Sequence, residues 1–248
     1  MFEKKLFLYL MNIIKYLSNP SENIEKSLRA RDLVSTFSIY VAVSLLSIVM
    51  SVIQNFLVQS PTVEMRENPL VTIADEGVLV LVFIVVLMAI AEEIAFRLPL
   101  KRTKWRIFTA LSIAFFFLYS KLLTDCLVLS LDDMMLRVGL TIGSMTLLCP
   151  LLLSSSMLKR INSLNYKYYF YSLAVLFGFG HLGNLDFQSI DDWSVTALFW
   201  IAIYALLKTL SGVVLGYARM RHGFRVACLM HVLHNLPPIL LAIFLLVE

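Results

Sequence analysis

The sequence predicts an all-α fold, a polytopic helical membrane protein with about seven transmembrane helices and an N-terminal amphipathic helix. Of its 248 residues, 59% are hydrophobic and only 15% are charged. Soluble domains are typically about 45–50% apolar and about 25% charged, so this composition indicates a membrane protein. The sequence also shows no internal repeat and no low-complexity tract, which favours a single helical membrane domain.

The N-terminal segment has the pattern of a helix that lies on the membrane surface. Residues 2–17 alternate in polarity, with Lys4, Asn12, Lys15 and Asn19 near one face. No small-x-small cleavage site follows, so a cleaved signal peptide is disfavoured. Residues 19–22, Asn-Pro-Ser-Glu, then predict the start of a second short polar helix, because they supply a cap, a first-turn proline and an N3 glutamate.

Seven apolar stretches follow that are long enough, or nearly so, to cross a bilayer, which takes about 20 helical residues. They cover residues 34–58, 77–100, 107–124, 134–158, 168–186, 195–218 and 226–247. The sequence therefore predicts two parts. Residues 1–33 form cytoplasmic amphipathic and polar helices, and residues 34–248 form a single transmembrane domain.

The connections between these stretches alternate in charge. The first 33 residues and the connections at 101–106, 159–167 and 219–225 are rich in Lys and Arg, whereas the alternate connections are acidic apart from Arg66. Because basic connections stay in the cytoplasm, this pattern places the N-terminus in the cytoplasm and the C-terminus outside. The expected location is a bacterial plasma membrane.

Two adjacent glutamates, Glu92 and Glu93, lie in the second apolar stretch. Carboxylates inside a membrane are costly and usually serve a function. Glu93 precedes Arg97 by four residues, the favoured order for a helical ion pair, and adjacent helical residues point about 100° apart. Glu92 is therefore left for another role. The alternative is that both glutamates reach the lipid headgroups together with Arg97.

Polar side chains recur in later apolar stretches. His181 follows Phe177 by four residues, and Asn235 follows His231 by four, so each pair shares one helix face. A lone histidine on an apolar face is otherwise most often a hydrogen-bonded core residue. Two prolines at 237–238 remove backbone donors just after Asn235, and inside lipid the carbonyls that they free require a polar or wet cavity.

Together these motifs resemble those of a known family. Glu-Glu-x-x-x-Arg at 92–97, Phe-x-x-x-His at 177–181 and His-x-x-x-Asn at 231–235 resemble the motif series of the CAAX protease and bacteriocin-processing (CPBP) family of intramembrane proteases. This family includes the type II CAAX prenyl endopeptidases. The resemblance spans residues 85–105 and 168–240 and implies that residues 34–248 form a protease-like domain.

The resemblance also implies a role for each residue. Glu92 would be the general base that activates water, with His181 assisting. His231 and Asn235 would stabilise the oxyanion or hold the water. Glu93 and Arg97 would organise the site.

The chain departs from the family pattern in two places. Leu98 and Pro99 follow Arg97 where the family usually has a glycine, and two extra apolar segments separate Arg97 from Phe177. An inserted pair of spans preserves the orientation of everything after it, so the site can survive this insertion.

A metal-free mechanism is favoured. The alternative is a zinc-dependent mechanism, as in a metalloendopeptidase. The zinc ligands would be Glu92, His181 and His231, with water as the fourth. The sequence lacks an HExxH motif. The predicted partners are the lipid bilayer and a peptide or protein substrate that could present a C-terminal tail; no nucleic acid is expected.

Two other classes of function are consistent with these residues. One is a non-catalytic membrane scaffold or bacteriocin-immunity protein that keeps the fold. The other is a proton-coupled transporter, since intramembrane carboxylates and histidines also relay protons. The absence of an inverted repeat disfavours the transporter.

Overall fold

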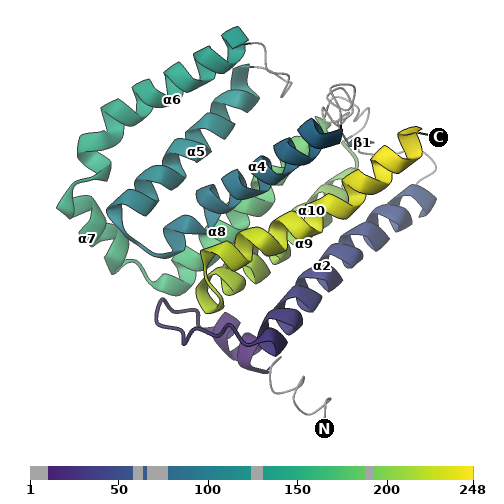
Figure 1. The fold of residues 1–248 in the computed structure, drawn as a ribbon, viewed down its shortest axis with the longest axis horizontal. Helices are drawn as coiled ribbons and strands as arrows, with labels where there is room; N and C mark the ends of the chain where they lie inside the picture. Colours follow the sequence, from purple (N-terminus) through teal and green to yellow (C-terminus); the bar gives the residue numbers. More distant parts are fainter. Residues whose placement is uncertain (1–10, 58–63, 66–77, 124–130, 188–192, 248) are drawn as a thin grey trace. The chain divides into compact units, whose positions relative to one another are not determined.

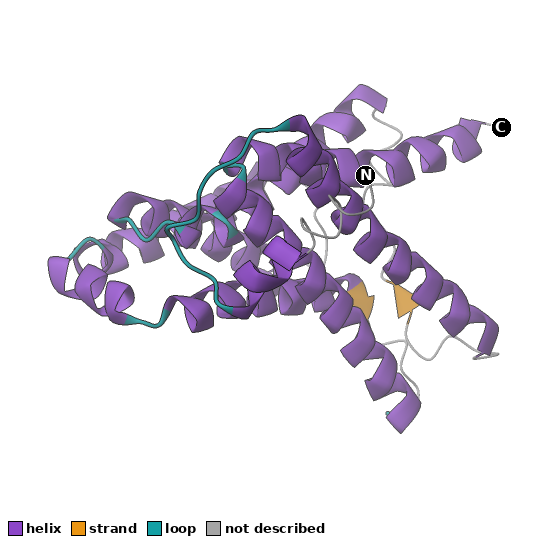
Figure 2. Cartoon of the chain, turned by 90° about the horizontal axis from the view of Figure 1, so that it is seen from below, coloured by secondary structure: helices purple, strands orange, loops and turns teal. Residues whose placement is uncertain are grey.

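The computed structural model describes residues 11–57, 64–65, 78–123, 131–187 and 193–247. These residues are mostly helical, with one pair of two-residue strands (Figure 2). The elements in chain order are α2 (Ala30–Leu57), β1 (Glu64–Met65), α4 (Val78–Phe96), η1 (Leu98–Leu100), α5 (Lys104–Leu123), α6 (Leu131–Leu152), α7 (Ser155–Ser163), α8 (Tyr166–Gly180), η2 (His181–Asn184), β2 (Leu185–Asp186), α9 (Val195–Arg221) and α10 (Phe224–Val247).

The chain divides into two compact units. Unit 1 comprises residues 1–67 and 166–230, and unit 2 comprises residues 68–165 and 231–248. Unit 1 therefore contains α2, α8, α9 and the strand pair. Unit 2 contains α4, α5, α6, α7 and the part of α10 that begins at His231.

Unit 1 is built on α9, against which α8 and α2 pack (Figure 1). Two glycines allow α8 and α9 to approach closely. A Cβ atom on Gly178 would lie 2.1 Å from Thr209 Oγ1 and 2.7 Å from the Ala205 carbonyl oxygen. One on Gly212 would lie 3.1 Å from the Phe177 ring. Small residues at these positions are typical of helix contacts in membranes.

The contact between α2 and α9 is a conventional apolar core. Tyr40 of α2 packs with Leu215 and Ala218 of α9 and with Ala227 and Met230 at the start of α10. All five are nearly inaccessible to solvent, so this core fixes α2 against α9 within unit 1.

The N-terminal segment docks on the start of α8. Residues 11–18 are helical, and residues 1–10 of the predicted surface helix lie outside the described residues. The Tyr16 ring meets the rings of Phe170 and Tyr217 edge-on, at centroid distances of 5.9 and 5.3 Å. The hydroxyl of Tyr171 donates to the Leu17 carbonyl. The position of this helix on a membrane surface stays a prediction.

The second polar helix predicted from residues 19–22 is wrong, because residues 20–29 are not helical. The backbone groups of this segment bond to other segments instead of forming an i,i+4 ladder. The Ser27 N–H donates to the Arg221 carbonyl at 2.9 Å, and the Tyr16 hydroxyl donates to the Ser21 carbonyl at 3.3 Å. These bonds replace the predicted capping box.

Unit 2 contains an antiparallel helical arrangement in which α5 packs against both α4 and α6 (Figure 1). The hydroxyls of Tyr119 and Ser144, at 2.5 Å, link α5 to α6. Arg102, between α4 and α5, donates to the carbonyls of Ile161, Asn162 and Leu164 at 3.0–3.3 Å. It thereby satisfies carbonyls that the end of α7 leaves without helical partners.

The fourth predicted span, residues 134–158, is shorter in the structure. The helix α6 ends at Leu152, and α7 begins three residues later. Ser154 starts α7, because its hydroxyl accepts a hydrogen bond from the Met157 N–H at 3.1 Å. A serine N-cap of this kind favours a new helix over continuation of the old one.

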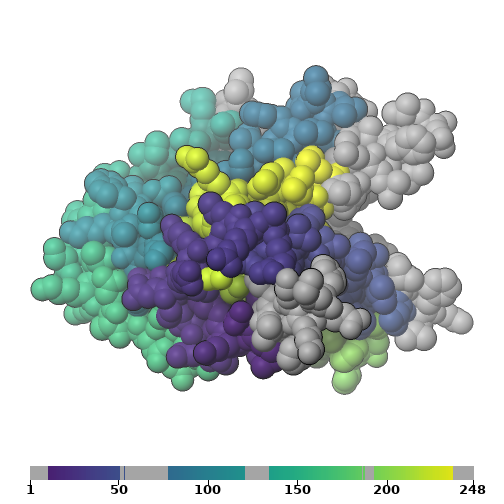
Figure 3. Space-filling view, turned by 60° about the horizontal axis from the view of Figure 1, so that its bottom comes forward, coloured from purple at the N-terminus to yellow at the C-terminus, as the bar shows by residue number. Residues whose placement is uncertain are grey.

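Four helices are long and apolar enough to cross a membrane in the part of the chain that the structure describes. They cover Ala30–Met50, Val78–Leu100, Met134–Leu152 and Val195–Arg221. Large apolar side chains on these helices are exposed, and Figure 3 shows the outer face of α2. Exposed apolar surface on this scale is consistent with an integral membrane protein. The three other predicted spans correspond to α5, α8 and α10, and their crossing of a bilayer stays a prediction.

Candidate active site

In unit 2, Glu92, Glu93 and Arg97 at the end of α4 lie close to His231 of α10. The predicted ion pair is present: Arg97 Nε lies 3.5 Å from Glu93 Oε1, and both side chains are almost fully buried. The helix ends here because Leu98 and Pro99 follow, and a residue before proline disfavours helical geometry. The 3₁₀ turn η1 follows, with Pro99 and Leu100 buried.

His231 lies between the two glutamates and contacts one with each ring nitrogen. Its Nδ1 is 3.0 Å from Glu93 Oε1, which is a hydrogen bond, and its Nε2 is 3.7 Å from Glu92 Oε2. The second distance is too long for a direct hydrogen bond. The His231 side chain is buried, and that of Glu92 is 21% exposed. Of the two carboxylates, Glu92 is therefore the more accessible.

This geometry determines which ring nitrogen carries the proton in neutral His231. The carboxylate of Glu93 can only accept, so Nδ1 carries the proton, and Nε2 presents its lone pair toward Glu92. The partnership of Glu93 with Arg97 was predicted, but its bond to His231 was not. The two residues are 138 positions apart, and their spacing carries no helical or strand signal.

The second oxygen of Glu93, Oε2, is buried and has no hydrogen-bond partner among the described residues. A buried carboxylate with an unused acceptor oxygen requires a further donor. The site therefore favours a water molecule or a substrate N–H beside Glu93.

Asn235 lies one helical turn after His231 on α10, on the same face, and is half-buried. The helix α10 continues through residues 237–238, so the two prolines do not end it. Asn235 is therefore positioned by the same helix as His231.

His181 belongs to unit 1. The α-helix α8 ends at Gly180, and His181 is the first residue of the 3₁₀ turn η2. Its Nδ1 lies 2.8 Å from the Phe177 carbonyl, and its ring packs on the Phe177 ring at 4.4 Å between centroids. Because a carbonyl only accepts, Nδ1 carries the proton and Nε2 is the acceptor in neutral His181. Its convergence with Glu92, His231 and Asn235 stays a prediction.

No group of three or more His, Cys, Asp or Glu side chains within the described ranges is arranged to hold a metal ion. In unit 2 the Arg97 guanidinium lies beside the carboxylate of Glu93, where a second cation would be repelled. The imidazole of His231 and the carboxylate of Glu92 still offer two donor atoms of the kind that zinc prefers.

Comparisons with known proteins do not assign a family. No protein-family model, no curated protein and no solved structure matches the chain.

Proposed function

We propose that the protein is an intramembrane endopeptidase of the CPBP type, which hydrolyses a peptide bond near the cytoplasmic face. The observation that carries the proposal is the position of His231 between Glu92 and Glu93 in a buried site. Three ionisable side chains and Arg97 in an apolar helical protein are costly unless they serve a function. In this arrangement Glu92 would act as the base, His231 would hold the water and Glu93 would orient His231.

In the proposed mechanism, Glu92 is the general base. A water about 2.8 Å from both Glu92 Oε2 and His231 Nε2 fits a pair of atoms 3.7 Å apart. This water donates one proton to each acceptor, so its lone pair is directed at the peptide carbonyl carbon. As its oxygen attacks, Glu92 takes the proton and later gives it to the leaving amine when the C–N bond breaks.

Glu93 orients His231 in this scheme, and Arg97 holds the carboxylate of Glu93 in place. The carboxamide of Asn235 is assigned to the oxyanion that forms on the carbonyl oxygen, as a neutral donor. His181 is assigned to assist Glu92, with Nε2 as its reactive atom because Nδ1 is committed to the Phe177 carbonyl. No step is assigned to a metal ion.

The decisive experiment uses the purified protein in lipid vesicles and a panel of peptides, some with prenylated C-terminal tails. Cleavage products identified by mass spectrometry should appear with the wild-type chain and be absent with Glu92→Gln. A chelator such as 1,10-phenanthroline should leave the rate unchanged, whereas inhibition that added zinc reverses would reassign Glu92 and His231 as zinc ligands. Products that form equally with Glu92→Gln would overturn the proposal.

We further propose seven spans with the N-terminus in the cytoplasm. Contacts within each unit support this topology. In unit 2, Arg102 of one basic connection bonds to residues 161–164 of another. In unit 1, Ser27 of the N-terminal segment bonds to Arg221. The strand pair joins two connections predicted on the opposite side, with Glu64 opposite Asp186. Connections expected on one side thus meet one another.

Single cysteines can test this topology in a variant that lacks Cys126, Cys149 and Cys228. A cysteine at Thr103, in the basic connection after η1, should be protected from an impermeant maleimide in intact cells. A cysteine at Ser189, which lies outside the described residues, should react. Labelling of Thr103 from outside would invert the orientation and place Glu92 near the opposite face.

A further inference from the structure

The ends of two candidate membrane spans meet in unit 1 at a cluster of three arginines, Arg29, Arg31 and Arg221. The span in α2 begins at Ala30, and the span in α9 ends at Arg221. The Ser27 N–H donates to the Arg221 carbonyl at 2.9 Å, which joins these ends directly. Residues at the ends of spans lie at the level of the lipid headgroups. The cluster is therefore located where lipid phosphates would be.

The acid in this cluster, Asp32, is buried and held by its own segment. The Ser27 hydroxyl donates to Asp32 Oδ2 at 2.5 Å. Arg31 Nε and Arg221 Nη2 lie on either side, each 3.9 Å from one Asp32 oxygen. At that distance the arginines are attracted to Asp32 without giving it a hydrogen bond.

His222 fixes the backbone beneath the arginines. Its Nδ1 lies 2.5 Å from the Ser27 carbonyl, and its Nε2 lies 2.8 Å from Thr36 Oγ1. Burial lowers the pKa of His222, so this ring is neutral at pH 7. His222 thus positions Ser27 and α2 without adding charge to the surface.

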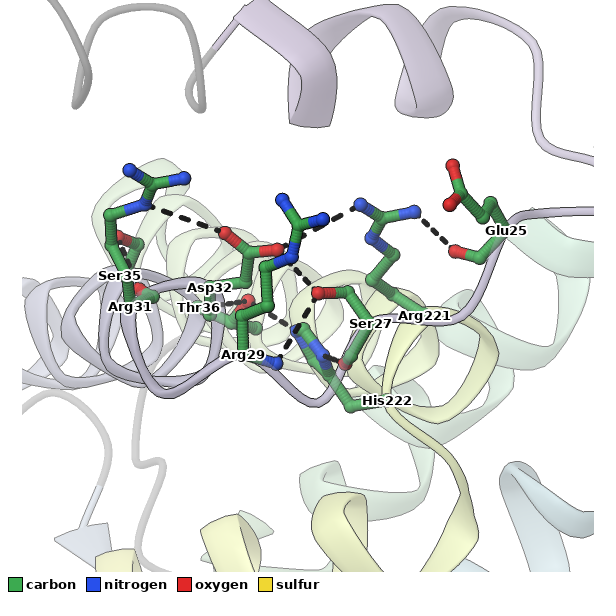
Figure 4. Close-up of polar contacts among 9 residues, drawn as sticks. All are labelled: Glu25, Ser27, Arg29, Arg31, Asp32, Ser35, Thr36, Arg221 and His222. Carbon is green, nitrogen blue, oxygen red and sulfur yellow. Dashed lines mark hydrogen bonds and ion pairs between the residues drawn. The ribbon is translucent and has the colours of Figure 1, made fainter.

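Three guanidinium groups lie on one side of this cluster, those of Arg29, Arg31 and Arg221 (Figure 4). Arg29 and Arg31 are exposed. Arg221 donates to the Glu25 carbonyl, and its buried Nε has no hydrogen-bond partner among the described residues. The three arginines against Asp32 and Glu25 leave a net charge of +1. The cluster therefore offers both N–H donors and excess positive charge.

We propose that this cluster binds the phosphate of an anionic phospholipid headgroup. Guanidinium groups suit phosphate because they donate two parallel hydrogen bonds. Apolar side chains flank the arginines: Leu28 is 68% exposed and Val34 is 64% exposed. These two would contact the acyl chains next to the bound headgroup. The position of the arginine cluster at the ends of two candidate spans favours a lipid over a free phosphate ion.

Lipid binding to the full-length protein in detergent can be measured by native mass spectrometry, with phosphatidylglycerol and phosphatidylcholine as probes. Wild-type protein should retain phosphatidylglycerol in preference to phosphatidylcholine. A charge-assisted hydrogen bond from a guanidinium group to the phosphate contributes roughly tenfold in affinity. Arg29→Gln combined with Arg31→Gln should therefore weaken phosphatidylglycerol binding by roughly 100-fold. The melting temperature should not change, because both side chains are exposed.

A matched control removes two exposed basic residues of α7, Lys159 and Arg160, by the same change to glutamine. This variant should bind phosphatidylglycerol within about twofold of wild type, and the lysine variants of Arg29 and Arg31 should lose part of the affinity, because an ammonium group cannot donate two parallel hydrogen bonds to the phosphate. An equal loss in both glutamine variants would show diffuse charge attraction and overturn the site. Displacement of the lipid by millimolar inorganic phosphate would overturn its assignment to a lipid.

Discussion

Glu93→Gln is expected to lose about 3–5 kcal/mol of unfolding free energy together with its activity, whereas Glu92→Gln is expected to lose activity alone. Glu93 is fully buried and lies 3.5 Å from the buried guanidinium of Arg97. Glutamine can still accept the hydrogen bond from His231, but it removes the negative charge beside the guanidinium of Arg97. Glu92 is partly exposed, and its Oε2 lies 3.7 Å from His231 Nε2, so its replacement should cost less stability than that of Glu93.

Chemical denaturation of both variants in the same detergent measures this difference, alongside the peptide cleavage assay. Glu93→Gln combined with Arg97→Met is the informative control, because it removes both charges and keeps a side chain of similar length. This double variant should recover much of the lost stability but no activity, because it removes both charges of the buried pair and leaves neither one uncompensated. Equal activity loss in Glu92→Gln and Glu93→Gln, with wild-type stability in both, would contradict the assignment.

Hydropathy and helical spacing predicted the features of this protein that depend on local sequence. Composition predicted the helical membrane character, and the apolar stretches located the long helices within the described residues. The i,i+4 spacing predicted the ion pair of Glu93 and Arg97, because a helix brings such residues together whatever surrounds them. These signals act within one element, so one sequence is enough to identify them.

The features that the sequence did not reveal depend on contacts between elements. The segment 20–29 has a good capping box, yet it forms no helix because Ser27 bonds to Arg221. The hydrogen bond of Glu93 to His231 joins different helices and leaves no mark on the spacing of either. The break before α7 was missed for a different reason: the predicted span was continued through the three serines at 154–156 to include Met157 and Leu158, whereas Ser154 caps a new helix.

Gly178→Ala is expected to destabilise unit 1 by about 1–3 kcal/mol, the usual cost of overpacking. The added methyl group would lie 2.1 Å from Thr209 Oγ1, 2.7 Å from the Ala205 carbonyl oxygen and 2.9 Å from the Thr209 backbone nitrogen. Rotation of the Thr209 side chain cannot relieve the two backbone clashes, so α8 must move away from α9. Phe177 and His181 lie on either side of Gly178 in sequence, and this movement would displace both.

Gly143→Ala on α6 is the matched control, because a Cβ atom there would meet nothing within 4 Å. It should raise stability by about 0.5–1 kcal/mol, since alanine restricts the unfolded chain more than glycine does. Thermal unfolding in detergent compares the two variants, and Gly178→Ala combined with Thr209→Ala should recover only part of the loss, because the backbone contacts of Ala205 and Thr209 persist. Wild-type melting of Gly178→Ala would show that α8 and α9 do not depend on this close approach. Loss of cleavage by Gly178→Ala beyond its loss of folded protein, with Gly143→Ala fully active, would instead tie the position of His181 to catalysis.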